Sequence, residues 1–93
     1  MIARTSPTFP LGKLVATPNA LNQVNQDDIN AALQRHVLGD WGDLCEEDKQ
    51  VNDRAAQEGA RILSAYQAPN GTKFWIITEG DRSITTILLP EDY

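Results

Sequence analysis

The sequence predicts an α+β domain in which two or three N-terminal helices pack on a C-terminal three-stranded antiparallel β-meander. Up to residue 58 the apolar residues recur at helical spacing, whereas from residue 61 they fall in short segments rich in β-branched and aromatic residues. Glycine-containing turns separate those segments. Helices followed by strands, rather than an alternation of the two, are typical of the α+β class.

The length of the chain, 93 residues, indicates one domain, which we expect at residues 11–93 after a loose N-terminal arm at residues 1–10. Residues 11–16 are a candidate short edge strand. Thr17 followed by Pro18 is typical of a helix N-cap with proline at the first helical position. A short helix to residue 24 is therefore predicted.

Two longer helices follow. In residues 27–38 the apolar side chains share one helical face, with aspartates in the first turn and Gly39 after the last. A second helix is predicted at residues 46–58, with Gly59 as its stop signal. Its apolar stripe is thin, so we expect it to lie on the surface.

Three strands are predicted at residues 61–67, 73–79 and 83–89, and the middle one is apolar on both faces. There Phe74 and Ile76 alternate with Trp75 and Ile77. One face should meet the helices. The other is either covered by the N-terminal arm, through Phe9 and Leu11, or exposed as a surface that binds a protein or a second copy of the chain.

Charge limits the classes of partner. Thirteen acids against eight bases give a net charge of -5, which repels phosphate and makes nucleic acid an unlikely partner. The acids concentrate in residues 40–53. They either occupy the start of a helix or form an acidic surface for a basic partner. No apolar segment is long enough for a membrane span or a secretory signal, so we expect a cytoplasmic protein.

Candidate reactive residues are few. His36 is the only histidine, and we interpret it as a boundary residue that satisfies a helix C-terminus. Cys45 is the only cysteine, which excludes an internal disulfide, and it is interpreted as a helix cap or a partly buried thiol. No phosphate-binding, hydrolase or zinc motif is present, so we predict no catalytic residue, no metal and no cofactor.

The loop at residues 39–43 has the most unusual local sequence, a tryptophan bracketed by two glycines and two acids. We expect Trp41 to fill the space between two helices, and Asp43 to help cap the second of them. A weaker alternative is a Ca²⁺ or Mg²⁺ site built from Asp40, Asp43 and backbone carbonyls.

Several strings carry a resemblance: GDWGD at 39–43, ILSAY at 62–66, WIITEGDRS at 75–83 and LPEDY at 89–93. With them, residues 15–93 resemble a family of short, uncharacterised bacterial proteins described as plasmid-related. Members are often carried on plasmids and integrated elements. The resemblance implies a bacterial mobile-element setting and no catalytic activity.

A second similarity is architectural. A strand, two helices and a three-stranded meander resemble the order of elements in RelE-type toxins, which are ribosome-dependent RNases. That similarity implies His36, Arg61, Tyr66 and Arg82 as residues for phosphate binding and proton transfer. Such toxins are typically basic, whereas this chain is acidic.

The sequence therefore supports two hypotheses: a non-enzymatic protein-interaction or accessory module of a mobile element, which charge and missing motifs favour, and an RNase toxin as the alternative. The partner of the module is expected to be a protein, including a second copy of the chain. The residues predicted to contact it are Trp75, Ile77, Arg82, Asp40 and Asp43.

Overall fold

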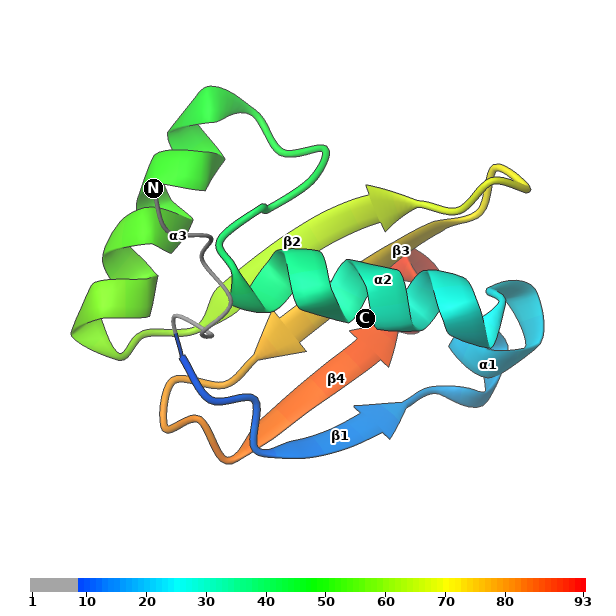
Figure 1. Ribbon diagram of the computed structural model, residues 1–93, viewed down its shortest axis with the longest axis horizontal. Coiled ribbons are helices and arrows are strands. Elements are labelled where there is room, and N and C mark those ends of the chain that lie inside the picture. Colours follow the sequence, from blue (N-terminus) through cyan, green and yellow to red (C-terminus); the bar gives the residue numbers. More distant parts are fainter. Residues whose placement is uncertain (1–8) are drawn as a thin grey trace, which may run out of the picture.

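A computed structural model of the protein describes residues 9–93 and confirms the α+β class (Figure 1). In chain order the elements are β1 (Lys13–Ala16), α1 (Pro18–Gln23), α2 (Gln26–Val37), α3 (Glu46–Glu58), β2 (Ile62–Gln67), β3 (Lys73–Thr78), β4 (Ile84–Leu88) and the 3₁₀ helix η1 (Pro90–Asp92). Every predicted helix and strand is present, with ends shifted by at most two residues. No helix within residues 9–93 is long and apolar enough to cross a membrane.

The sheet has four strands in the order β1-β4-β3-β2. β2, β3 and β4 form the predicted antiparallel meander. The expected edge strand is also present, and it joins the same sheet by pairing parallel to β4. The sheet is therefore mixed and four-stranded, where the sequence predicted three strands with an optional fourth.

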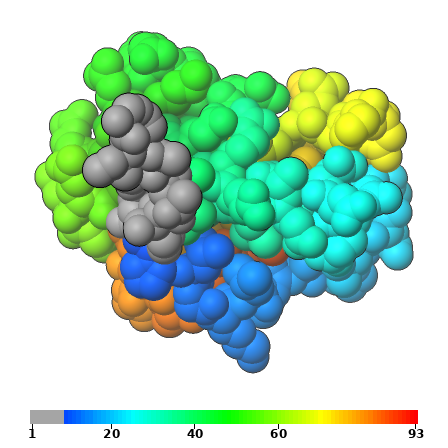
Figure 2. Space-filling view, in the orientation of Figure 1, coloured from blue at the N-terminus to red at the C-terminus, as the bar shows by residue number. Residues whose placement is uncertain are grey.

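The helices lie on one face of this sheet (Figure 1). In Figure 2, seen from that side, α2 and α3 conceal most of the sheet. Side chains from α1 and α2 pack on inward-facing residues of β2, β3 and β4 in the larger core cluster, whose members include Ala20, Val24, Ile29, Ala32, Tyr66, Phe74, Ile76 and Ile87. The predicted alternation is thus confirmed: Phe74 and Ile76 face the helices.

A smaller core cluster lies between α3 and the sheet and contains Phe9, Trp41, Ala55 and Ile62, with Leu11 packed against it. Phe9 is only 4% exposed, so the packed part of the chain begins before residue 11. The alternative in which Phe9 and Leu11 cover the second sheet face is wrong, because both pack on the helix side. The remainder of the predicted arm, residues 1–8, lies outside the described residues.

The helix termini follow the predicted local chemistry with one exception. The Thr17 hydroxyl accepts a hydrogen bond from Ala20 N, and Gly59 ends α3 with φ 78°, in the left-handed region. Cys45 occupies the N-cap position of α3 but makes no side-chain capping bond. The predicted cap by Asp43 is wrong, because Cys45 and not Asp43 occupies the N-cap position of α3. The backbone N–H of Asp43 donates to the carbonyl of Ala65 in β2 at 2.7 Å.

That hydrogen bond is one of two by which the loop at residues 39–43 pairs with β2 and covers this edge of the sheet. The carbonyl of Trp41 accepts from Ala65 N at 3.2 Å, so the loop pairs with β2 on both sides of Gly42. A Cβ at Gly42 would lie 2.0 Å from the carbonyl oxygen of Ala65, so only glycine fits. Two residues along, the side-chain amide of Asn52 binds both the N–H and the C=O of Leu63. Unpaired edges invite association, and this edge is covered.

Candidate functional site

His36 is the centre of a buried polar network beneath α2. Its Nδ1 lies 2.5 Å from the hydroxyl of Ser64 in β2, and its Nε2 lies 2.8 Å from that of Thr78 in β3. Thr78 contacts Thr85 of β4 at 2.8 Å, and Thr85 donates to the carbonyl of Leu11 at 2.7 Å. All four side chains of the network are fully buried.

The Leu11 carbonyl fixes the direction of the bonds from Thr85 through Thr78 to Nε2 of His36, because a carbonyl oxygen can only accept. With the Thr85 proton directed to that carbonyl, Thr78 must donate to Thr85. The Thr78 oxygen then accepts from the N–H at Nε2 of His36. Because burial lowers the pKa of His36 to about 4, Nδ1 carries no proton near neutral pH and accepts from Ser64. The imidazole is therefore the neutral Nε2–H tautomer.

Burial lowers the pKa of His36 to about 4, and the positive charge of Arg82 contributes to the shift. A serine hydroxyl bound to a neutral histidine is the geometry of an activated nucleophile. Both groups are 0% exposed, however, so no substrate reaches them. The pair joins α2 to the sheet. The expectation of a boundary histidine is thus wrong, since the position on the inward face of α2 directs the ring into the core.

The four residues implied by the toxin similarity do not meet at one open site. His36 and Tyr66 are buried on the helix side, where the Tyr66 hydroxyl donates to the carbonyl of Asp40 at 2.7 Å. The guanidinium of Arg82 binds the carbonyls of Ala55 and Ala60. Arg61 lies on the sheet face opposite His36 and Tyr66, where it contacts Tyr93. This arrangement gives no support to phosphate binding by the set.

We call the sheet face turned away from α2 the outer face. Strand alternation places Leu63, Ala65, Trp75, Ile77, Thr86 and Leu88 there. Trp75 is partly buried, whereas Ile77 is only 2% exposed. Tyr93, which follows η1, lies against Trp75 with ring centroids 5.7 Å apart and is itself 67% exposed. Helices α1 and α2 pack on the opposite face of the sheet.

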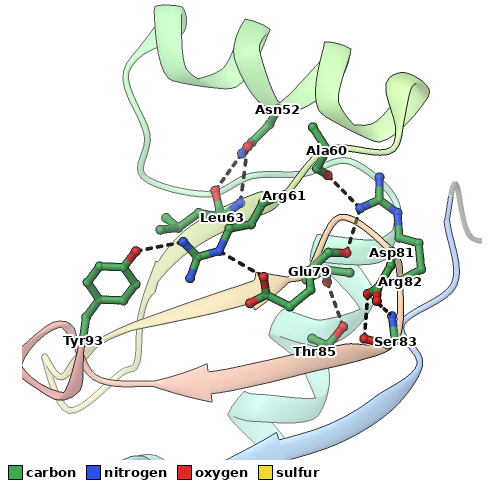
Figure 3. A network of polar contacts seen from close by, with 11 residues as sticks. Asn52, Ala60, Arg61, Leu63, Glu79, Asp81, Arg82, Ser83, Thr85 and Tyr93 are labelled. Carbon is green, nitrogen blue, oxygen red and sulfur yellow. Dashed lines mark hydrogen bonds and ion pairs between the residues drawn. The ribbon is translucent and has the colours of Figure 1, made fainter.

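Arg61 holds Tyr93 in place on the outer face (Figure 3). Its Nη1 donates to the Tyr93 hydroxyl at 2.8 Å, and its guanidinium carbon lies 5.4 Å from the Tyr93 ring centroid. Its Nε lies 3.5 Å from a carboxylate oxygen of Glu79. One arginine thus links the ends of β2 and β3 with the C-terminal residue. This contact was not predicted, because it joins residues far apart in the sequence.

An open groove of about 290 Å³ adjoins the outer face on the other side of Arg61. It runs between α3 and β2, with Leu44, Val51 and Leu63 as its apolar lining and Asp48 at its margin. Val51 is 57% exposed, which is unusual for a β-branched aliphatic residue. Arg61 lines the groove and also contacts Tyr93, which lies against Trp75, so Arg61 lies between the groove and the two aromatic side chains.

The structure brings together only part of the predicted contact set. Trp75 and Ile77 share the outer face, and Asp43 is exposed at the β2 edge beside Ala65, the strand neighbour of Trp75. Asp40 binds the Arg35 guanidinium at 2.8 Å, which lowers the pKa of its carboxyl. Arg82 lies at the far end of the sheet, beneath the ring of Phe9.

The weaker alternative of a cation site is not favoured by the geometry of the loop. One oxygen of Asp40 accepts from Gly42 N at 3.3 Å, and both oxygens bind Arg35. Within residues 9–93 no group of three or more acidic, histidine or cysteine side chains is arranged to hold a metal ion. Cys45 is exposed, not partly buried.

No family model, no curated protein and no solved structure matches the chain. The resemblance to plasmid-related proteins therefore stays a prediction, and function has to be argued from the site alone.

Proposed function

We propose that the protein is a non-enzymatic interaction module that binds a protein partner through the outer face and the groove beside it. In keeping with the sequence resemblance, we propose that it acts as an accessory protein of a bacterial mobile element, in the cytoplasm. The observation that carries the proposal is the arrangement of Val51, Leu63, Trp75 and Tyr93 around Arg61.

The composition of this surface is that of a protein-binding site. Aromatic residues and arginine are enriched at the centres of interfaces, where they supply most of the binding energy. Tyr93 is held by Arg61 and Trp75 before any partner arrives, so little side-chain entropy is lost on binding. The groove offers a place for an aliphatic side chain of the partner between Leu44 and Val51.

Charge indicates the chemistry of the partner. Arg61 and Lys73 lie on the outer face, although the chain as a whole has a net charge of -5. Acidic side chains adjoin the same surface, because Glu79 pairs with Arg61 and Asp48 of the first turn of α3 lies at the margin of the groove. The partner is therefore a protein surface with an apolar centre and a border that carries both signs of charge.

Site-specific photo-crosslinking tests this proposal. A benzoylphenylalanine placed at Tyr93 should form an adduct with a protein in extracts of the native cells. The same group at Gln34, which is exposed on α2, is the matched control and should form none. Unlabelled protein should compete for the adduct at position 93, whereas the Trp75→Ser variant should compete poorly.

Equal adducts at the two positions, or equal competition by the variant, would contradict the proposal. Folding of the variant is checked by far-UV circular dichroism, because Trp75 is partly buried. No observation favours the RNase alternative, since its four candidate residues are dispersed or buried.

A further inference from the structure

The two edges of the sheet are treated differently. At β2 the edge is covered by the loop around Gly42 and by the amide of Asn52. At β1, the other edge, the strand pairs only with β4. Figure 1 shows β1 as the outermost strand of the sheet. It contains no proline and no bulge, which are common devices against edge pairing.

The backbone of β1 has groups free to pair outward. The N–H groups of Lys13 and Thr17 donate toward β4, to the carbonyls of Ser83 and Ile87, each at 3.0 Å. Because successive residues of a strand alternate in direction, Leu14 and Ala16 present their N–H and C=O groups away from β4. Within residues 9–93 nothing pairs with them.

We propose that β1 pairs with β1 of a second copy of the chain, antiparallel about a two-fold axis, with Leu14 opposite Ala16 of the second copy. In this register Leu14 and Ala16 exchange both of their backbone hydrogen bonds with the second copy, twice over by symmetry. Two complementarities select a second copy as the occupant and select this register.

The first complementarity is one of size. Leu14 is 50% exposed and lies on the helix side of the sheet, beside the small side chain of Ala16. An open groove of about 150 Å³ runs there between β1 and the helices, with Leu21, Ile29 and Leu33 in its lining. In the proposed register Leu14 of each copy lies over Ala16 of the other and enters this groove. Pairing Leu14 with Leu14 would instead place the two large side chains directly opposite each other.

The second complementarity is one of charge. The register places Lys13 opposite Thr17 of the second copy, with both side chains on the outer face. The Thr17 hydroxyl donates to a carboxylate oxygen of Asp92 at 2.7 Å. That bond keeps the pKa of Asp92 below its usual value, so the carboxylate is charged at neutral pH. The Lys13 ammonium of each copy therefore lies beside the Asp92 carboxylate of the other copy.

The dimer would be a continuous eight-stranded sheet, with the outer faces of both copies on the same side, because opposite residues of antiparallel strands point to the same face. It would present two copies of the Trp75 and Tyr93 surface to a partner. The inference does not depend on the proposed function, since β1 and the outer-face groove lie at opposite edges of the sheet.

Sedimentation of the full chain at concentrations up to about 100 µM tests the dimer, since an interface with Kd of about 1 µM would be nearly fully formed there. Leu14→Pro removes an N–H that makes no bond inside one copy, so this variant should stay folded and become monomeric. Lys13→Glu should weaken the dimer about tenfold through two like-charge pairs, whereas Lys73→Glu, the same change on another strand, should not.

Hydrogen exchange gives an independent readout that does not require a variant. The amides of Leu14 and Ala16 should become protected as the protein concentration rises, whereas that of Val15 should be protected at all concentrations. A monomer at every concentration would overturn the proposal and leave an extended segment of another protein as the occupant of the edge. A dimer that survives Leu14→Pro, or one without protection at Ala16, would also overturn it.

Discussion

Arg82, in the turn between β3 and β4, donates from Nη2 to the carbonyl of Ala55 at 2.9 Å and so closes the C-terminal end of α3. Its Nη1 also binds the carbonyl of Ala60 at 2.7 Å. Arg82 has φ 61° and is the one non-glycine residue with positive φ in the described part of the chain. The strained backbone conformation thus occurs at the residue whose side chain makes these hydrogen bonds (Figure 3).

Two substitutions at Arg82 separate the side-chain bonds from the backbone strain. Arg82→Ala should lower the free energy of unfolding by about 2 kcal/mol, because the carbonyls at the end of α3 lose a charged donor. Arg82→Gly loses the same bonds but adopts positive φ without cost, so it should be less destabilising by about 1 kcal/mol. Urea unfolding measures both. A glycine variant less stable than the alanine variant would contradict the assignment of strain.

The stability of the protein should fall as the pH drops from about 6.5 to about 4. The pKa of His36 is lowered from 6.5 to about 4 by folding, so the unfolded chain binds a proton before the native protein does. The stabilisation is fully present above pH 6.5 and is lost progressively down to the folded pKa. The loss amounts to about 3 kcal/mol.

Chemical denaturation between pH 7 and pH 4 checks this dependence, with His36→Gln as the comparison, since glutamine does not titrate. The carboxylates of Asp40, Asp81 and Asp92 have lowered pKa values and lose their contribution only below their usual range near 3.8. An equally steep fall in the His36→Gln variant between pH 6.5 and pH 4.5 would show that another group is responsible.

The helices and the meander could be predicted because their signals are local. Thr17 with Pro18, the aspartates before Ile29 and the glycine at 59 each mark a helix end within a few residues. The pairing of β1 with β4 could not be predicted in the same way. It joins Lys13 to Ile84, which lie far apart in the sequence. The four residues of β1 show no pattern that identifies the strand with which they pair.

Only part of the candidate site could be predicted from the sequence. Trp75 was found because alternation on an apolar strand requires two covered faces. Its neighbours Tyr93 and Arg61 were not found, because their contact depends on where η1 directs the last residue. The sequence does contain a pattern that predicts the partners of His36. Ser64, Thr78 and Thr85 all fall at inward positions of their strands, opposite a histidine on an inward helix face.

Truncation of Trp41 should cost about 3–5 kcal/mol. The side chain is 3% exposed, stacks on Phe9 with centroids 6.2 Å apart, and donates from Nε1 to a carboxylate oxygen of Asp53 at 2.8 Å. Trp41→Phe keeps the stacking and loses the hydrogen bond, so it should cost about 1 kcal/mol. A loss below about 1 kcal/mol for Trp41→Ala in urea unfolding would contradict its role as a core residue.

Removal of the Tyr93 ring should uncover Trp75 without unfolding the protein. Tyr93 is 67% exposed, so Tyr93→Ala should cost less than about 1 kcal/mol, yet its ring is the nearest aromatic neighbour of Trp75. In a Trp41→Phe background the emission of Trp75 should shift to longer wavelength, and acrylamide should quench it more strongly. Tyr93→Phe keeps the ring and loses only the bond to Arg61, so the emission should stay near its original position. Unchanged emission in Tyr93→Ala would mean that Tyr93 does not cover the outer face in solution.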